Sequence, residues 1–435
     1  MNKLIEKYNK VENVLLISSY PEKGVRYSQK DSPAIGGFAK NTIDALKKTR
    51  LDSKYIILTI AIDGKQEVYE ENGNLVIRLF ERNNLLSFIP LIKTILKFNK
   101  VKSVLTEFEF SSWGNIKITS LLLLLFAILR LLSKKQILIL HQMVTDLKSL
   151  NGHLGWSKND IRSYFYNLLL KIYYKFLVIL NSKIVVTEEI FKRRLAKITG
   201  NKNKIITIPH GVDSKMRVVN KNSALKKLGL PRNKTIVLYF GYLSWYKGAD
   251  LFFKYAKRSK NKNYYFIMAG GPSFTNAGKN FYKDYLQKLK NPTKNLRITG
   301  FVHEDQIPFY FSVADIVVLP YRTMMSSSGP LSLAFSFNKP VLLSNKLQGY
   351  IESRDFKDTL ENCKINKKDM FFSLKSEEFY KKIKNADLNK LRKFSESMRK
   401  KRNYLNIVQK YNPLLFQEKT LKLENRNYLR AINEI

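Results

Sequence analysis

Short apolar runs rich in isoleucine, valine and leucine alternate with helix-length segments along the first half of the chain. The strand-like runs are Val14–Ser18, Tyr55–Ile60, Leu75–Phe80, Val101–Thr106, Ile137–Leu140 and Ile184–Thr187. Helix-length segments such as Asn41–Lys48 and Leu85–Asn99 lie between several of them. This alternation is typical of βαβ units, so the pattern predicts an α/β fold with a doubly wound parallel sheet.

The same pattern restarts in the second half. Proline and glycine in Pro209–Asp213 break the period after the strand-like run Ile205–Ile208, and a polar, lysine-rich stretch continues to Asn233. A second set of strand-like runs follows: Thr235–Phe240, Tyr264–Ala269, Leu296–Thr299, Ile316–Leu319 and Val341–Ser344. We therefore expect two doubly wound domains, residues 1–212 and 213–387, with only helices after Ser376.

Two such domains in series face each other across a cleft. The carboxyl ends of the strands, and the amino termini of the helices that follow them, meet at this edge of each sheet. Helix amino termini carry unpaired N–H groups and partial positive charge, which suit a diphosphate. The residues that carry the chemistry are therefore expected directly after the strands.

Composition limits the compartment. The 435 residues hold one cysteine, Cys363, which excludes an intramolecular disulfide and fits a reducing interior. No secretion signal opens the chain, and the apolar segment Ile116–Leu132 is interrupted by Lys117 and Arg130. Because it is shorter than the roughly 20 apolar residues that a span needs, we interpret it as a buried helix and expect a cytoplasmic protein.

The formal net charge of +42 admits nucleic acid, an anionic membrane surface or a phosphate-bearing substrate as partner. The lysines are spread along the whole chain, so a general compositional bias explains the charge equally well. No basic block resembles a nucleic-acid module, and we predict no nucleic-acid partner. The basic, aromatic segment Ile161–Leu180 has two interpretations, a helix packed in the core or a helix lying on anionic lipid.

Glycines occur in two of the loops that follow predicted strands. Gly36 and Gly37 precede the helix expected from Asn41, while Gly241 follows a strand and Lys247 stands just before the next helix. Glycine lets the backbone approach a ligand, and lysine adds a point charge beside the helix dipole, so these residues predict a phosphate site. A plain turn and a solvated loop lysine are the alternatives.

Small polar residues follow the predicted strand Ile316–Leu319. Ser327, Ser328 and Gly329 lie there, directly before the apolar helix that contains Leu331. Hydroxyl and N–H groups at a helix start can bind phosphate or sugar oxygens, whereas a helix cap without a ligand is the simpler interpretation.

Three further polar residues follow strands of the first half. His141 directly follows Ile137–Leu140 and could bind a sugar hydroxyl or a developing charge, or it could be structural. Glu107 and Glu109 follow Val101–Thr106 and could reach an acceptor, although alternation alone places them on one face. His153 and His303 have no paired ligands nearby, so no metal site is predicted.

Six short motifs across Ile184 to Ser344 have an order and spacing that resemble the family 4 glycosyltransferases of the GT-B fold. They are Ile184–Glu189, Ile206–Asp213, Gly241–Asp250, Ile267–Pro272, Ile298–Val302 and Ala314–Pro320. The amino-terminal half is similar only through the Gly36–Gly37 loop and the strand end at His141. The tail beyond Ile351 is poorly matched.

The resemblance implies two Rossmann-like domains facing each other across a cleft. It also implies transfer of a sugar from a UDP- or GDP-linked donor to an acceptor hydroxyl, with retention at the anomeric carbon and with no metal or cofactor. The last helices of the family cross back, so residues of about 388–435 would complete the first domain.

The resemblance assigns roles to the candidate residues. The glycine loops, with Gly241, and Lys247 would approach the donor diphosphate, and the backbone of Val302 would meet the base. His141 would face the transferred sugar.

Two departures from the family stand out. Tyr242 occupies the position of an arginine, and Met325 and Leu333 occupy the positions of two glutamates. A relative pattern with Ser-Gly in place of the glutamates resembles Ser327–Gly329, and in that branch these residues, with Leu331 after them, would bind donor oxygens. Loss of the second carboxylate removes the usual partner of the ribose hydroxyls.

Two hypotheses follow. The first is an active transferase that uses a nucleotide sugar and a glycan, glycolipid or polysaccharide acceptor, peripheral on the inner face of the cell membrane. The second is a catalytically weak or inactive GT-B protein that acts as a binding or scaffold partner of another transferase.

Overall fold

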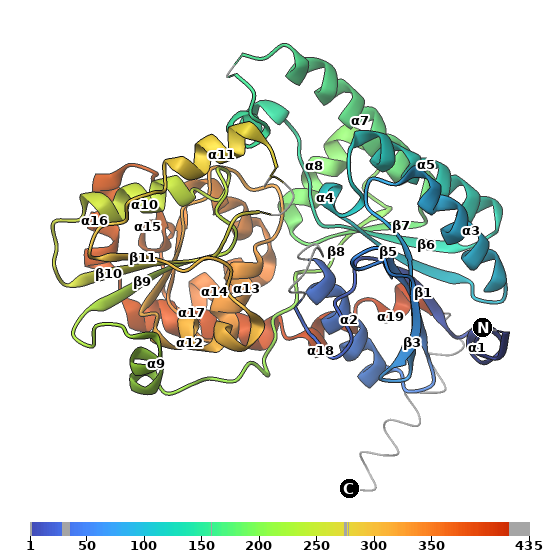
Figure 1. The fold of residues 1–435 in the computed structure, drawn as a ribbon, viewed down its shortest axis with the longest axis horizontal. Coiled ribbons are helices and arrows are strands. Elements are labelled where there is room, and N and C mark those ends of the chain that lie inside the picture. Colours follow the sequence, from blue (N-terminus) through green and yellow to red (C-terminus); the bar gives the residue numbers. More distant parts are fainter. Residues whose placement is uncertain (1, 28–34, 158, 274–275, 277, 417–435) are drawn as a thin grey trace, which may run out of the picture.

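The computed structural model describes residues 2–27, 35–157, 159–273, 276 and 278–416. Two α/β halves lie side by side, each around its own sheet (Figure 1). In this part of the chain the first sheet has the order β3-β4-β2-β1-β5-β6-β7-β8 and the second the order β11-β10-β9-β12-β13-β14. In the described residues neighbouring strands of both sheets run parallel, except that β3 runs antiparallel to β4. The predicted α/β class with two doubly wound sheets is confirmed.

The first half contains eight strands and most of the long helices. Its strands are β1 Val14–Ile17, β2 Tyr55–Ile60, β3 Glu67–Glu71, β4 Asn74–Phe80, β5 Ser103–Phe108, β6 Lys135–Leu140, β7 Lys183–Val186 and β8 Ile205–Thr207. Its α-helices are α1 Asn2–Tyr8, α2 Ile35–Thr49, α3 Phe88–Lys97, α4 Phe110–Trp113, α5 Ile116–Leu131, α6 Asn151–Leu154, α7 Arg162–Leu180 and α8 Glu189–Thr199, with the 3₁₀ turns η1 Leu85–Ser87 and η2 Leu147–Leu150.

The remaining elements form the second half and the carboxyl-terminal helices. The strands are β9 Thr235–Phe240, β10 Tyr264–Ala269, β11 Leu296–Ile298, β12 Ile316–Leu319, β13 Val341–Ser344 and β14 Phe371–Phe372. The helices are α9 Lys221–Leu228, α10 Ala249–Arg258, α11 Asn280–Gln287, α12 Ile307–Val313, α13 Gly329–Ser336, α14 Arg354–Asn362, α15 Lys367–Met370, α16 Ser376–Asn385, α17 Leu388–Lys401, α18 Tyr404–Val408 and α19 Asn412–Leu415, with η3 Glu304–Gln306 and η4 Asn345–Glu352.

Alternation along β1 shows how the first sheet is buried on both faces. Leu15 and Ile17 belong to the cluster that includes side chains of α3, α5 and α7. Val14 and Leu16 belong to the opposite cluster, which α2, α18 and α19 supply. A strand covered on both faces must be apolar at every position, which is why these strands are visible in the sequence as continuous apolar runs.

Every predicted strand occurs, with ends within two residues of the expected ones. β3 and β14 were not predicted, because the first is an exposed, acidic edge strand and the second has only two residues. The prediction that the glycine loop precedes a helix from Asn41 was wrong, since α2 begins at Ile35 and Gly36 and Gly37 lie in its first turn. A Cβ at Gly37 would lie 2.5 Å from Cδ1 of Tyr27, so the Tyr27 ring can pack against the helix only because this position has no side chain.

The chain crosses between the halves twice, at two segments that pair with each other. Val212, after β8, forms a parallel bridge with Asn403, and the N–H of Val212 donates to the carbonyl of Arg402 at 2.7 Å. Before the second crossing α17 packs on α13 and α14, and after it α18 packs on α2. The return of α18 and α19 to the first sheet places a carboxyl-terminal segment against the amino-terminal half.

No helix among the described residues is both long enough and apolar enough to cross a membrane. The helix α5, interpreted from the sequence as buried, contributes Leu122, Leu125 and Phe126 to the core but leaves Leu124 and Leu131 exposed.

Candidate functional site

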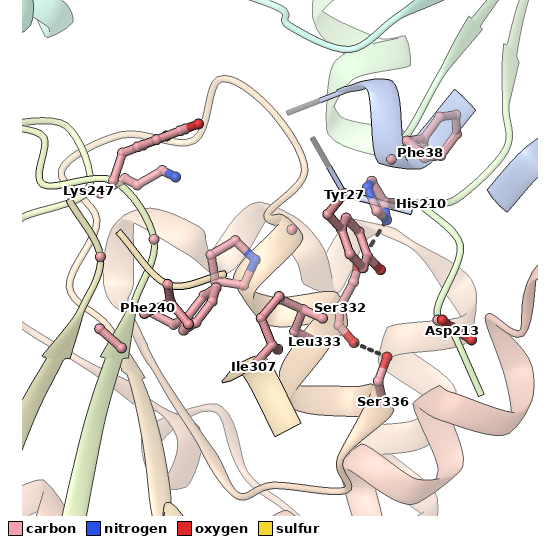
Figure 2. A pocket seen from close by; sticks show the side chains of 18 of the residues that line it. Tyr27, Phe38, His210, Asp213, Phe240, Lys247, Ile307, Ser332, Leu333 and Ser336 are labelled. Atoms are coloured by element: carbon pink, nitrogen blue, oxygen red, sulfur yellow. Dashed lines mark hydrogen bonds between the residues drawn. The ribbon is translucent and has the colours of Figure 1, made fainter. Parts of the chain in front are cut away.

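A cleft of about 1130 Å³, counted to its open mouth, lies between the two halves (Figure 2). Its walls come from the start of α2, the crossing segment after β8, the loops after β9, β10 and β11, and the start of α13. The second sheet reverses its strand order between β9 and β12, and the first sheet does so between β1 and β5. Ligands of doubly wound folds bind outside the strand ends at such points, so the cleft lies where the topology predicts.

Glycines bring three backbone turns together on the second-half wall. Gly241 has a φ of 115° and Gly300 a φ of 75°, values that side chains strongly disfavour. A Cβ at Gly270 would collide with the carbonyl of Gly241, and one at Gly271 would lie 2.8 Å from the amide nitrogen of Phe301. The backbone itself therefore forms this wall, with Val302 at its end.

Lys247 supplies the positive charge of the cleft. Its Nζ lies 5.7 Å from the ring centroid of Tyr242 and 5.8 Å from that of Tyr246. Among the described residues no hydrogen bond or ion pair holds this ammonium group. Burial lowers the pKa of Lys247 to about 8, an effect that the charge of Glu109 opposes. A cation with its solvation reduced and no fixed partner is well placed to receive an anionic ligand.

The start of α13 shows why its serines differ in role. Ser328 caps the helix, since its hydroxyl accepts from the N–H of Leu331 at 3.3 Å. The hydroxyl of Ser327 donates to the Glu188 carboxylate at 3.1 Å, and its Oγ lies 2.8 Å from the hydroxyl oxygen of Thr187, both in the first half. Of the four residues predicted here, only Gly329 lines the cleft, while the Leu331 side chain is buried.

On the first-half wall an aromatic ring covers the predicted histidine. Phe38 packs edge-on against His141, with ring centroids 4.8 Å apart, and also contacts His210 at 4.9 Å. Phe38 and His210 line the cleft, and His141 does not. Behind the ring, Nε2 of His141 lies 3.6 Å from Oε2 of Glu107. In the described structure this nitrogen and Oε1 of Glu107 have no hydrogen-bond partner.

The two predicted glutamates have different surroundings. Glu107 is fully buried, and burial raises the pKa of its carboxyl group while His141 and Ser18 oppose the rise. Glu109 accepts a hydrogen bond from Gln142 at 2.7 Å, and its charge acts across the cleft on both Lys247 and Tyr242. Glu109 therefore faces the second half, whereas Glu107 holds the buried position next to the histidine.

His210 is a site residue that the sequence analysis did not select. Its Nδ1 lies 2.8 Å from the carbonyl oxygen of Gly211 and 3.0 Å from Oγ of Ser332. Burial lowers the pKa of His210 to about 4, so the ring is neutral at physiological pH. The run Pro209–Asp213 marked this segment as a motif, and a histidine between proline and glycine at a strand end was the available signal.

The two residues that the resemblance places at glutamate positions, Met325 and Leu333, both make apolar contacts. Met325 is buried with Val144 and Leu150 of the first half, and its carbonyl accepts from the N–H of Met143 at 2.6 Å. Leu333 lines the cleft beside Ile307 (Figure 2). Tyr242 also lines the cleft. Leu333 and Tyr242 therefore give this wall apolar and aromatic contacts, while Asp213 of the crossing segment brings a carboxylate to the cleft.

Two doubly wound α/β halves with a cleft at both switch points define the GT-B fold. Within this fold, residues 220–370 match the family model described as Glycosyl transferases group 1. A comparison with curated protein sequences gives no match.

Solved structures support the same class. Sucrose-phosphate synthase from Thermosynechococcus elongatus is 15% identical with a TM-score of 0.64, covering 96% of this chain and 99% of that one. The Anabaena protein HepE, in complex with UDP and glucose, is 14% identical with a TM-score of 0.61, covering 92% and 97%. The trehalose-6-phosphate protein of E. coli, bound with UDP-2-fluoro glucose, is 9% identical with a TM-score of 0.62, covering 93% and 99%. These likenesses show that the chain shares the GT-B fold of these structures.

Proposed function

We propose that this protein is a retaining glycosyltransferase that moves a sugar from a nucleotide-sugar donor to a hydroxyl of a glycan, glycolipid or polysaccharide acceptor. The observation that carries the proposal is Lys247, a cation with a lowered pKa and no fixed partner among the described residues, in a cleft walled by glycine turns. A diphosphate has the charge and size to lie against such a wall. UDP is the first nucleotide to test, because HepE and the E. coli protein were solved with UDP-linked ligands.

Different residues of the cleft would bind different parts of the donor. The backbone turns of Gly241 and Gly329 with Lys247 would hold the diphosphate, and Val302 would meet the base through its backbone. In the transfer step, the bond from the anomeric carbon to the phosphate oxygen breaks. The acceptor oxygen bonds to the same face of that carbon, and its proton passes to the departing phosphate. Lys247 would stabilise the negative charge that the leaving diphosphate gains.

His141 and Glu109 are the proposed residues on the sugar and acceptor side. His141 lies behind Phe38, so its contact with the transferred sugar requires the Phe38 ring to move aside. Nε2 of His141 has only the 3.6 Å contact with Glu107, and Oε1 of Glu107 has no hydrogen-bond partner among the described residues. A ligand hydroxyl that formed hydrogen bonds with these groups would gain free energy, which gives a physical reason for that motion. Glu109 does not line the cleft but lies near enough to act on Lys247 and Tyr242, and we propose that it accepts a hydrogen bond from the acceptor.

Met325 and Leu333 favour a second candidate, a GT-B protein that binds a transferase partner without catalysing transfer. Among the described residues the second-half wall of the cleft carries no carboxylate for the ribose hydroxyls, and Asp213 of the crossing segment is paired with Arg26, so the affinity for a ribonucleotide would be lower. In this second function the GT-B fold would serve to bind the partner through its surface, and no nucleotide sugar would stabilise the protein.

A panel of nucleotide sugars tests the proposal. UDP- and GDP-linked sugars should raise the thermal unfolding midpoint for at least one member, because a ligand at about 100 times its dissociation constant stabilises the native state by about 2.7 kcal/mol. Differential scanning fluorimetry, with ATP and free sugars as controls, measures this shift. No stabilisation by any nucleotide sugar would favour the non-catalytic candidate.

A further inference from the structure

The helix α7 has a stripe of apolar side chains that is exposed on the surface of the protein. Its exposed apolar side chains recur at helical spacing, and together with the residue before the helix they are Ile161, Tyr164, Phe165, Leu168, Leu169, Ile172, Phe176 and Ile179. Phe165 is 61% exposed and Leu168 is 58% exposed. An amphipathic helix of a globular protein normally buries such a stripe, so an outward-facing one indicates a surface that binds something apolar.

Two neighbouring elements extend this surface. The helix α5 packs against α7 and exposes Leu124 and Leu131. The helix α3 lies on the same side of the first sheet as these two helices (Figure 1). Together with η1 it exposes further apolar side chains. These are Leu85, Leu86, Ile89 and Leu96. Of the 21 exposed large apolar residues in the described part of the chain, 15 belong to η1–α3, α5 and α7 or directly precede α7. We call this surface the α3–α5–α7 face.

The charges of this face have one sign. No aspartate or glutamate occurs in residues 83–106, 110–145 or 161–187. The exposed basic side chains of the three helices are Lys93, Lys97, Lys117, Arg130, Arg162, Lys171 and Lys175, of which Arg162 is paired with Asp160. Between residues 83 and 187 the only acidic residues are Glu107, Glu109, Asp146 and Asp160, and all four lie between these three ranges. A general excess of lysine does not explain why the carboxylates avoid one face.

Apolar, aromatic and basic side chains on helices that lie flat are what an anionic bilayer surface binds. The apolar groups enter the headgroup region, and each lysine or arginine near the surface contributes about 1 kcal/mol. Two copies of this chain pressed together through the same face would bring two sets of cations into contact, which is unfavourable. The charge pattern therefore favours lipid over self-association.

We infer that the α3–α5–α7 face docks the protein on an anionic lipid bilayer. The inference deepens the proposed function, since it names the surface that would bring a membrane-bound acceptor to the first half. The docking itself does not depend on donor binding. Its test can therefore succeed or fail independently of the nucleotide-sugar panel.

Vesicle sedimentation of the full-length protein tests the inference. The protein should sediment with vesicles of phosphatidylcholine and phosphatidylglycerol in equal parts and remain in solution with phosphatidylcholine alone. The variant Phe165→Glu with Phe176→Glu should bind the anionic vesicles at least roughly 10-fold more weakly, because it removes two inserted rings and adds two repelled charges. Both positions are exposed, so the unfolding midpoint and any nucleotide-sugar stabilisation should equal those of the wild type.

The matched control is Leu51→Glu with Val218→Glu, which adds the same charge at exposed apolar positions outside the face. It should bind vesicles like the wild type. Absence of vesicle binding, equal binding to both vesicle types, or equal loss in both variants would overturn the inference. Sedimentation velocity that shows a dimer broken by Phe165→Glu with Phe176→Glu would overturn it too, in favour of a second copy as occupant.

Discussion

Replacing Lys247 with methionine is expected to weaken binding of the nucleotide donor by roughly 100-fold, or about 2.7 kcal/mol. Methionine keeps an unbranched side chain between the rings of Tyr242 and Tyr246 but removes the charge that would face the diphosphate. Isothermal titration calorimetry with the best nucleotide of the panel measures the loss. The control is Lys254→Met, an exposed lysine on α10, which should bind like the wild type.

The same lysine sets the direction of the pH dependence. Its pKa in the free protein is about 8, and a bound diphosphate raises this pKa because it favours the ammonium form. Binding is therefore strongest and constant below about pH 8 and weakens as the pH rises above it. Titrations with a nucleotide sugar, whose diphosphate charge stays constant in this range, should show the decline in the wild type and not in Lys247→Met. A wild-type affinity that does not change above pH 8 would contradict the assignment of Lys247 to the diphosphate.

The second large effect is expected at Arg402, which ties the crossing segments to both halves. Its guanidinium donates to both carboxylate oxygens of Glu188 at 2.6 and 3.0 Å and to those of Asp355 at 2.7 and 3.0 Å. Arg402 and Glu188 are almost fully buried. Burial opposes the charge of Arg402, but the two carboxylates hold its pKa above the ordinary value.

Arg402→Met should lower the free energy of unfolding by about 3–5 kcal/mol, because it leaves the Glu188 carboxylate buried without its cation. Urea unfolding followed by circular dichroism measures the change. Adding Glu188→Gln to Arg402→Met should recover part of the loss, since the buried charge is then gone. Arg193→Met breaks the exposed pair with Glu352 and should cost less than about 1 kcal/mol. Equal losses in Arg402→Met and Arg193→Met would contradict the assigned role.

The strands could be predicted because parallel strands covered on both faces leave continuous apolar runs. Val14–Ile17 and Tyr55–Ile60 are buried at every position, and both were recognised from the sequence. The edge strand Glu67–Glu71 has three glutamates among its five residues and is exposed on most of its length, so its sequence resembles that of a loop. A strand could be recognised in the sequence because it is buried on two faces, more than because of its strand propensity.

The site was predictable where it depends on backbone turns after strands. Gly37, Gly241, Lys247, Val302 and Gly329 all line the cleft. Side chains whose roles depend on the other half of the molecule could not be placed from the sequence. Whether a polar residue faces the cleft or contacts the other half depends on how the two halves pack. A local sequence pattern contains no information about this packing.

Ser327 and His141 illustrate the point. Ser327 follows the same strand as Gly329 but is held by Thr187 and Glu188 of the first half. His141 stands at the predicted strand end but lies behind the ring of Phe38, which the sequence shows only as one residue after the glycines.

The most direct test of the central claim is a crystal structure of the protein with the best nucleotide sugar of the panel bound. The diphosphate should lie within hydrogen-bond distance of Nζ of Lys247 and of the backbone at Gly329, with the base beside the backbone of Val302. A nucleotide bound away from this cleft, or a diphosphate that does not contact Lys247, would contradict the claim that the cleft is a donor site.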